Sequence, residues 1–235
     1  VGVSVGVVAV LTSLPFIGQI GQLFLFGSEL KALRAHPGFR ADIDRNALAL
    51  YLRHNCIPAP HSIYQDIHKL KPATILRFSA NSSAARTTTA PYWSLQEAAE
   101  RGFAEPFRGS SLEAAAQLDA LLRDAVRIRM VADVPLGVLL SGGVDSSAVT
   151  ALMQAQSSRP VRTFSIGFRE MDYNEAPHAA SVAQHLGTEH TELYVAPADA
   201  MNVIPALPRI YDEPFADSSQ IPTFLVCQMA RQHVT

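Results

Sequence analysis

The stretch with the clearest chemistry is a glycine-containing segment that follows an apolar run near the middle of the chain. Residues 138–147 read Val-Leu-Leu-Ser-Gly-Gly-Val-Asp-Ser-Ser. The apolar residues are typical of the end of a buried strand, and the two glycines permit a sharp turn or a close ligand approach. A helix is expected over 146–156. Because free N–H groups and the dipole at a helix start attract anions, the segment predicts a phosphate site.

A carboxylate inside this loop indicates a cation as well as an anion. Asp145 alone would repel a phosphate, so its presence favours a divalent cation between the two groups, and hard oxygen ligands suit magnesium. The loop lacks the lysine and the four-residue gap of the common P-loop. A plain glycine turn between a core strand and a core helix is the alternative. The complete string is more typical of a functional loop than of that alternative.

A second loop rich in carboxylates and hydroxyls lies near the end of the chain. Residues 211–219 read Tyr-Asp-Glu-Pro-Phe-Ala-Asp-Ser-Ser. Crowded carboxylates predict a nearby metal cation, ammonium or guanidinium, and hydroxyls before a helix predict a bound carboxylate or phosphate; an amino-acid substrate carries both charges. We therefore predict substrate contacts for Glu213, Asp217 and Ser218. An acidic, capped surface loop is the alternative.

The elements around residues 138–147 alternate between strand and helix. The sequence predicts strands at 161–168 and 190–195 and helices at 175–186 and 198–204. This alternation predicts an α/β fold in which a parallel sheet has helices on both faces, and ligands bind beyond the carboxyl ends of its strands. Ile166 lies at such an end, where its main chain can pair with an adenine edge. A plain core strand is the alternative there.

The first half of the chain has a different organisation. Expected elements are a strand at 23–26, a helical turn at 29–35, a helix after Asp44, a strand at 73–78, a solvated hairpin tip or loose connection at 79–91, and a long helix that opens at Ser111 and stops at Pro135. Residues 94–110 are mixed in character, and we place the domain boundary there. The expected domains are therefore 1–95 and 111–235.

Composition limits the class of protein. The 235 residues carry a net charge of −2 without a basic block, which disfavours nucleic acid as a partner. Two cysteines are too few for a disulfide framework and fit a reducing cytoplasm. Residues 1–26 are uncharged, but glycine, proline and glutamine interrupt them. We expect two core strands there in preference to a signal peptide or a membrane span.

Taken together, the motifs resemble the glutamine-hydrolysing asparagine synthetase family. Residues 136–147, 164–168 and 212–219 resemble its synthetase domain, an N-type ATP pyrophosphatase that cleaves ATP between the α and β phosphates. Residues 26–33 and 57–64 resemble the end of its glutaminase domain. The resemblance implies an adenine nucleotide α-hydrolase-like, Rossmann-like sheet, preceded by the α+β tail of an N-terminal-nucleophile glutaminase domain.

The resemblance also implies an activity and a set of ligands. Aspartate would be adenylated by ATP at its side-chain carboxylate with release of pyrophosphate, and ammonia from glutamine would then give asparagine. Such an enzyme is a carbon–nitrogen ligase of the cytoplasm, without a membrane partner, for which a homodimer is one oligomeric state. The implied ATP-binding residues are Leu140, Ser141, Gly142, Gly143, Asp145, Ser146, Ser147 and Ile166, with Asp145 as the magnesium ligand.

Several departures from the family separate this chain from a complete enzyme. The family's glutaminase uses an N-terminal cysteine, whereas this chain begins at Val1. A second nucleotide loop, Ser-Gly-Asp/Glu-Gly-x-Asp-Glu in the family, would follow Thr235. We therefore expect the 235 residues alone to bind ATP weakly and to show no catalytic turnover. Two alternatives remain: a different carboxylate acceptor, as in β-lactam synthetase-like or exopolysaccharide-cluster amidotransferases, and a non-catalytic remnant that only binds a partner.

Overall fold

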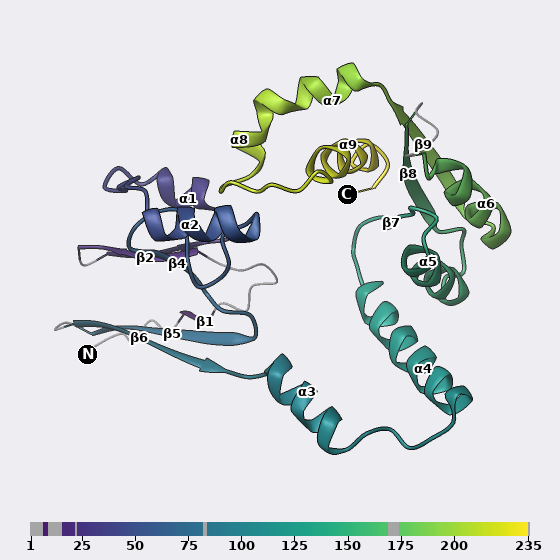
Figure 1. Cartoon of the computed structure of the whole chain (residues 1–235), viewed down its shortest axis with the longest axis horizontal. Coiled ribbons are helices and arrows are strands. Elements are labelled where there is room, and N and C mark those ends of the chain that lie inside the picture. The colour runs from purple at the N-terminus through teal and green to yellow at the C-terminus, as the bar shows by residue number, and fades with distance from the viewer. Residues whose placement is uncertain (1–6, 9–15, 22, 82–83, 169–173, 235) are drawn as a thin grey trace. The chain divides into compact units, whose positions relative to one another are not determined.

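The computed structural model describes residues 7–8, 16–21, 23–81, 84–168 and 174–234, which form two compact units (Figure 1). Unit 1 comprises residues 1–106 and 206–217, and unit 2 comprises residues 107–205 and 218–235. The expectations for most of residues 1–15 lie outside the described part of the chain. Within the described ranges, every helix is too short or too polar to cross a membrane.

Unit 1 contains two antiparallel three-stranded sheets with short helices. The strand order is β1-β5-β6 in one sheet and β3-β2-β4 in the other. A stacked ring pair, Phe24 and Phe78 with centroids 4.5 Å apart, connects the two sheets. The elements are β1 (Val7–Val8), β2 (Phe16–Ile20), β3 (Leu23–Gly27), α1 (Leu30–Arg34), α2 (Arg45–His54), β4 (Ile67–Lys69), β5 (Thr74–Asn81), β6 (Ala84–Pro91), α3 (Leu95–Ala104) and α8 (Leu207–Ile210).

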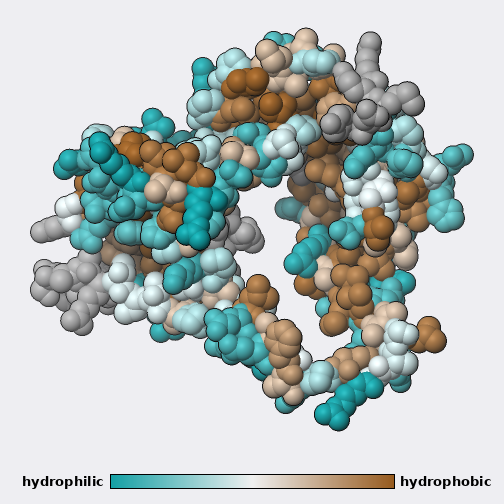
Figure 2. Space-filling model, in the orientation of Figure 1, coloured by the Kyte–Doolittle hydropathy of each residue, from teal (hydrophilic) through white to brown (hydrophobic). Residues whose placement is uncertain are grey.

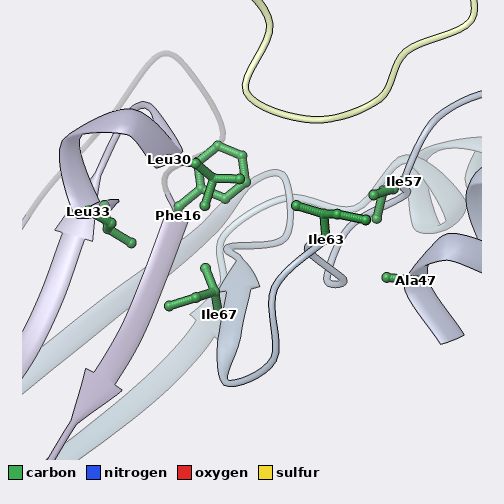
Figure 3. Close-up of a cluster of buried hydrophobic side chains, with 7 residues drawn as sticks. All are labelled: Phe16, Leu30, Leu33, Ala47, Ile57, Ile63 and Ile67. Atoms are coloured by element: carbon green, nitrogen blue, oxygen red, sulfur yellow. The ribbon is translucent and has the colours of Figure 1, made fainter. Parts of the chain in front are cut away.

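One hydrophobic cluster forms the core of unit 1 (Figure 3). It joins β2, α1, α2 and β4 to the loop between α2 and β4, so the first helices cover the β3-β2-β4 sheet. The predicted start of α2 is confirmed, because the Asp44 carboxylate accepts hydrogen bonds from the amides of Asn46 at 2.8 Å and Ala47 at 3.4 Å. The buried members of the cluster are Phe16, Leu30, Leu33, Ala47, Ile57, Ile63 and Ile67.

Two segments of unit 1 are more regular than expected. Residues 84–91 form strand β6, which pairs along β5 from Asn81↔Ala84 to Thr74↔Pro91, so of the two interpretations of residues 79–91 the hairpin is supported and the loose connection is wrong. Backbone pairing holds an edge strand without an apolar face, and the threonines favour extended structure. Residues 95–104 form helix α3, whose Ser94 cap accepts the Glu97 amide at 3.2 Å. This helix has no buried residue, yet Leu95, Ala98, Ala99 and Phe103 recur at helical spacing, so the sequence carried the pattern although Gly102 interrupts it.

Unit 2 is built on a parallel three-stranded sheet of order β7-β8-β9, which confirms the predicted parallel pairing. Its strands are separated by helices, as the alternation predicts. The elements are α4 (Ser111–Arg129), β7 (Gly137–Leu139), α5 (Val144–Gln156), β8 (Arg162–Phe168), α6 (Ala176–Leu186), β9 (Glu189–Val195), α7 (Pro197–Val203) and α9 (Gln220–Ala230), and a 3₁₀ turn, Ile204–Ala206, follows α7.

Helices α9 and α6 contact β8 through residues that point to opposite sides of the strand. Phe164 packs against α9, whereas a Cβ atom added to Gly167 would lie 3.0 Å from the Cβ of Ala176 in α6. Because successive strand residues point to opposite faces, the two helices cover different faces of the sheet (Figure 1). The structure is thus mixed α/β; the finer Rossmann-like classification remains a prediction.

Helix α4 begins at Ser111, as predicted. Its cap is Ser110, whose hydroxyl accepts the Glu113 amide while the Glu113 carboxylate accepts the Ser110 amide at 2.7 Å, and this completes a capping box. Apolar residues recur along α4 at helical spacing, but only Val126 is buried. Leu112, Leu118, Leu121 and Ile128 are exposed, and Figure 2 shows this apolar surface along α4.

A partly buried histidine on β9 predicts a pH dependence of stability. His190 Nδ1 lies 2.9 Å from Thr163 Oγ1, and burial lowers the pKa of His190 below its ordinary 6.5, opposed by the nearby Glu192 carboxylate. Below about pH 6.5 the unfolded chain therefore binds more protons at this position than the folded chain, so the free energy of unfolding should fall as the pH decreases from there towards the folded pKa.

Urea unfolding at pH 7.5 and pH 5.5 checks this expectation. The variant His190→Gln should lose less stability between the two pH values than the wild-type chain. The exposed His185→Gln is the matched control and should behave like the wild type. An equal pH dependence in wild type and His190→Gln would contradict the expectation.

Candidate functional site

The predicted strand, glycine turn and helix are present as one continuous loop in unit 2. Strand β7 ends at Leu139, and the next amide, that of Leu140, donates to the carbonyl of Phe164 on β8 at 2.8 Å. The chain then turns through Ser141 and the glycines and enters α5 at Val144. The loop therefore lies at the carboxyl end of β7, where ligands bind in parallel α/β sheets.

The first glycine of the turn has no room for a side chain. Gly142 has a φ angle of +79°, which favours glycine. A Cβ atom there would lie 2.7 Å from the Ala179 amide nitrogen and 2.8 Å from the Cβ of His178, both in α6. The loop thus rests directly on the first turns of α6. Sequence reasoning missed this support, because no local pattern relates residue 142 to residues 178 and 179.

Serine hydroxyls hold the loop closed. The hydroxyls of Ser141 and Ser146 are 2.9 Å apart, and Ser146 also donates to the Gly143 carbonyl at 3.2 Å. The Gly143 amide donates to the Ser141 hydroxyl at 3.4 Å. These bonds fix the direction of the backbone at the start of α5, as a preorganised anion site requires.

One hydroxyl of the loop has no protein partner. The Ser147 Oγ atom is buried and makes no hydrogen bond with any residue that the structure describes. A buried polar group without a partner costs roughly 1–3 kcal/mol, so such atoms call for a specific explanation. Together with the N-terminal amides of α5, this hydroxyl fits a phosphate group better than it fits a plain structural turn.

Asp145 lies exposed in the first turn of α5. Within the described ranges, no group of three or more histidine, cysteine, aspartate or glutamate side chains is arranged to hold a metal ion. Magnesium commonly binds proteins through one or two carboxylates and takes its other ligands from phosphates and water. The single carboxylate therefore fits a magnesium ion that arrives with a polyphosphate. A favourable charge at the helix start is the simpler reason for an aspartate here.

The main chain of Ile166 lies where β8 extends beyond β7. Strand β7 pairs with β8 only up to Leu139↔Phe164, whereas β8 continues to Phe168. Leu140, by contrast, is buried, and both of its main-chain groups have partners: its carbonyl accepts the Ser165 hydroxyl at 2.5 Å, and its amide donates to Phe164. Of the two residues predicted to contact the nucleotide through the main chain, Ile166 has the geometry that suits an adenine edge better.

The structure divides the predicted substrate residues between the two units. Glu213 and Asp217 belong to unit 1, and Ser218 belongs to unit 2. Asp217 and Ser218 are exposed just before α9. The Glu213 carboxylate already has protein partners, since Oε1 accepts the Ile63 amide at 2.8 Å and Oε2 forms an ion pair with Lys69. A substrate role for these three residues stays a prediction.

Two family models match this chain. The model described as asparagine synthase matches residues 117–235, and the model described as glutamine amidotransferase domain matches residues 13–93. The first match covers most of unit 2, and the second lies within the main part of unit 1.

Curated relatives are similar over most of the chain. The chain is 37% identical over 218 residues to putative asparagine synthetase [glutamine-hydrolyzing] 2 of Methanocaldococcus jannaschii, which covers 92% of this chain and 40% of the relative. It is 28% identical over 211 residues to asparagine synthetase [glutamine-hydrolyzing] 1 of Bacillus subtilis, which covers 89% of this chain and 31% of the relative. The chain thus spans less than half the length of these relatives.

Proposed function

The chain belongs to the asparagine synthase family, and we propose on that basis that it is part of a glutamine-dependent carbon–nitrogen ligase that makes asparagine. ATP would supply the adenylate leaving group that turns the side-chain carboxylate of aspartate into a good acyl donor. Pyrophosphate is released in that step, and ammonia from glutamine then displaces AMP. Relatives that are named asparagine synthetase favour aspartate over another carboxylate acceptor.

In this proposal the loop after β7 holds the pyrophosphate end of ATP. The N-terminal amides of α5 and the hydroxyl of Ser147 donate hydrogen bonds to phosphate oxygens, and the Ser146 hydroxyl joins them when it exchanges its bond to the Gly143 carbonyl for one to phosphate. The unpartnered Ser147 Oγ atom is the observation that carries the proposal, because a phosphate oxygen would satisfy it. Asp145 would hold magnesium at the pyrophosphate, where the ion offsets the charge of the leaving group.

The remaining assignments follow from the same proposal. The main chain of Ile166 contacts adenine, and Asp217 and Ser218 contact the amino-acid substrate. The unit that contains residues 13–93 corresponds to the tail of the glutaminase domain, and unit 2 corresponds to the first part of the ATP pyrophosphatase domain. The earlier expectations of a cytoplasmic enzyme, a homodimer, and no nucleic-acid or membrane partner stay predictions.

Calorimetric titration with Mg-ATP tests the proposal on the chain itself. The wild-type chain should bind, and Asp145→Asn should bind about 10-fold more weakly, because a neutral amide loses the charge that holds the metal. Asp133→Asn is the matched control, since this exposed aspartate also lies in unit 2 and loses the same charge. Absence of binding by the wild-type chain would contradict the proposal and favour a non-catalytic remnant.

A further inference from the structure

A short acidic segment of the chain is built into a unit that is otherwise formed by the first 106 residues. Residues 206–217 belong to unit 1, although the residues before and after them belong to unit 2. Two adjacent carboxylates, Asp212 and Glu213, make polar contacts that bind this segment to the rest of unit 1. These contacts explain neither nucleotide binding nor the predicted substrate role of the loop.

The Asp212 carboxylate caps a helix that is distant in the sequence. Its Oδ2 atom accepts the Leu30 amide at 2.7 Å, and its Oδ1 atom accepts the Lys31 amide and contacts Lys31 Nζ, both at 3.2 Å. The local cap residue of α1, Glu29, makes no side-chain capping bond. A residue 182 positions away from Leu30 therefore satisfies the amides that begin α1.

The Glu213 carboxylate is held by the core of unit 1. Besides the Ile63 amide, it pairs with Lys69, and Lys69 Nζ also donates to the Ile57 carbonyl at 2.6 Å. Both charged side chains are only 10% exposed. A buried charge is tolerated when it is paired and hydrogen-bonded, so each member of this pair depends on the other.

A backbone contact continues the attachment beyond the two acids. The Ala216 amide donates to the carbonyl of Asn55, the αL residue that ends α2, at 2.9 Å. The attachment thus extends to the residue before Asp217, and α9 begins at Gln220. Residues 212–216 are therefore held within unit 1 along their length.

We propose that Asp212 and Glu213 form an anchor that docks residues 206–217 on the rest of unit 1, the unit that contains the amidotransferase-matching residues. In this role Glu213 binds Lys69 and does not contact substrate. The ammonium group predicted beside the acidic loop is then the Lys69 side chain of the same chain, not that of a substrate. The anchor goes beyond the proposed function, because it requires neither ATP nor turnover.

A double-mutant cycle on the whole chain tests the anchor. Lys69→Met and Glu213→Gln each leave one buried partner without its counterpart, so each should lower the melting temperature of the first unfolding transition by about 10 °C or more. The double variant should melt no lower than the worse single variant, since neither charge is then left unpaired. Lys71→Met, at an exposed lysine two residues away, is the matched control and should match the wild type.

Hydrogen exchange separates docking of the segment from general stability. In Lys69→Met, peptides from residues 206–217 should exchange faster, whereas peptides from β8 should keep the wild-type rate. Additive effects in the cycle would overturn the anchor. Wild-type melting and exchange in Glu213→Gln would also overturn it and would leave the substrate role for Glu213. Lys69→Met should bind Mg-ATP with the wild-type affinity. If the wild-type chain itself does not bind ATP, the proposed function is contradicted, but the double-mutant cycle still tests the anchor.

Discussion

Replacing Gly142 by alanine should abolish Mg-ATP binding and lower the free energy of unfolding of unit 2 by about 2–4 kcal/mol. The positive φ angle of 79° costs an alanine roughly 1–2 kcal/mol. The new methyl group would also lie 2.7 Å from the backbone nitrogen of Ala179, a buried residue of α6 that has little room to move. Overpacking of this kind costs about 1–3 kcal/mol. Either the loop or α6 must shift, and the loop then loses its anion-binding geometry.

Gly187→Ala is the matched control for this prediction. Gly187 ends α6 with a φ angle of +70°, but, apart from its chain neighbours and the adjacent helix backbone, no heavy atom of the described residues lies within 4 Å of the position that its Cβ would take. The control should therefore show the backbone strain alone, about 1 kcal/mol, and keep Mg-ATP binding. Urea unfolding and calorimetry measure both effects. Equal behaviour of the two variants would mean that the contact between the loop and α6 is unimportant for binding.

The strand–turn–helix geometry at residues 138–147 was predictable because its signals are local. A buried strand, two glycines and a helix start follow one another within ten residues, and each has a recognisable residue pattern. The strength of the signal comes from residue types that the backbone itself requires, such as glycine where φ is positive. The support from His178 and Ala179 was not predictable, since it depends on how α6 packs against the turn.

Elements with little burial were the ones that sequence reasoning missed. Strand β6 is held by backbone pairing, which produces no apolar periodicity, whereas α3 has apolar residues at helical spacing but buries none of them. In α4, by contrast, the hydrophobic periodicity predicted the helix correctly but did not predict which residues are buried, because only Val126 is buried. Hydrophobic period therefore predicted the type of element better than it predicted which residues are covered.

The sequence of the acidic loop predicted a nearby cation correctly, but it did not identify which group the cation is. Crowded carboxylates predict a nearby cation, and an amino-acid substrate was the expected source. The structure provides Lys69 beside Glu213 and Lys31 beside Asp212. Ion pairs between residues this distant in the sequence cannot be predicted from a single sequence. The type of partner was thus predictable, whereas its identity depended on the tertiary fold.

Replacing Phe164 by alanine should destabilise unit 2 by about 3–5 kcal/mol, the range for loss of a buried aromatic ring. Phe164 is 2% exposed and packs against Val226, Met229 and Ala230 of α9. Its ring also fills the space left by Gly137, where an added Cβ atom would lie 2.5 Å from the ring. The ring therefore joins β8 both to α9 and to the start of β7.

The same substitution should weaken Mg-ATP binding, although Phe164 is not proposed to touch the nucleotide. The Phe164 carbonyl accepts the Leu140 amide at the point where β7 leads into the loop, so a displacement of β8 reaches Ser141, the first residue of the proposed phosphate loop, within one residue. Phe103→Ala, at a side chain that is 88% exposed, is the control and should change stability by no more than about 0.5 kcal/mol. Urea unfolding measures both variants. A loss below about 1 kcal/mol in Phe164→Ala would show that α9 does not depend on this ring, and the packing of the sheet described above would then be incorrect.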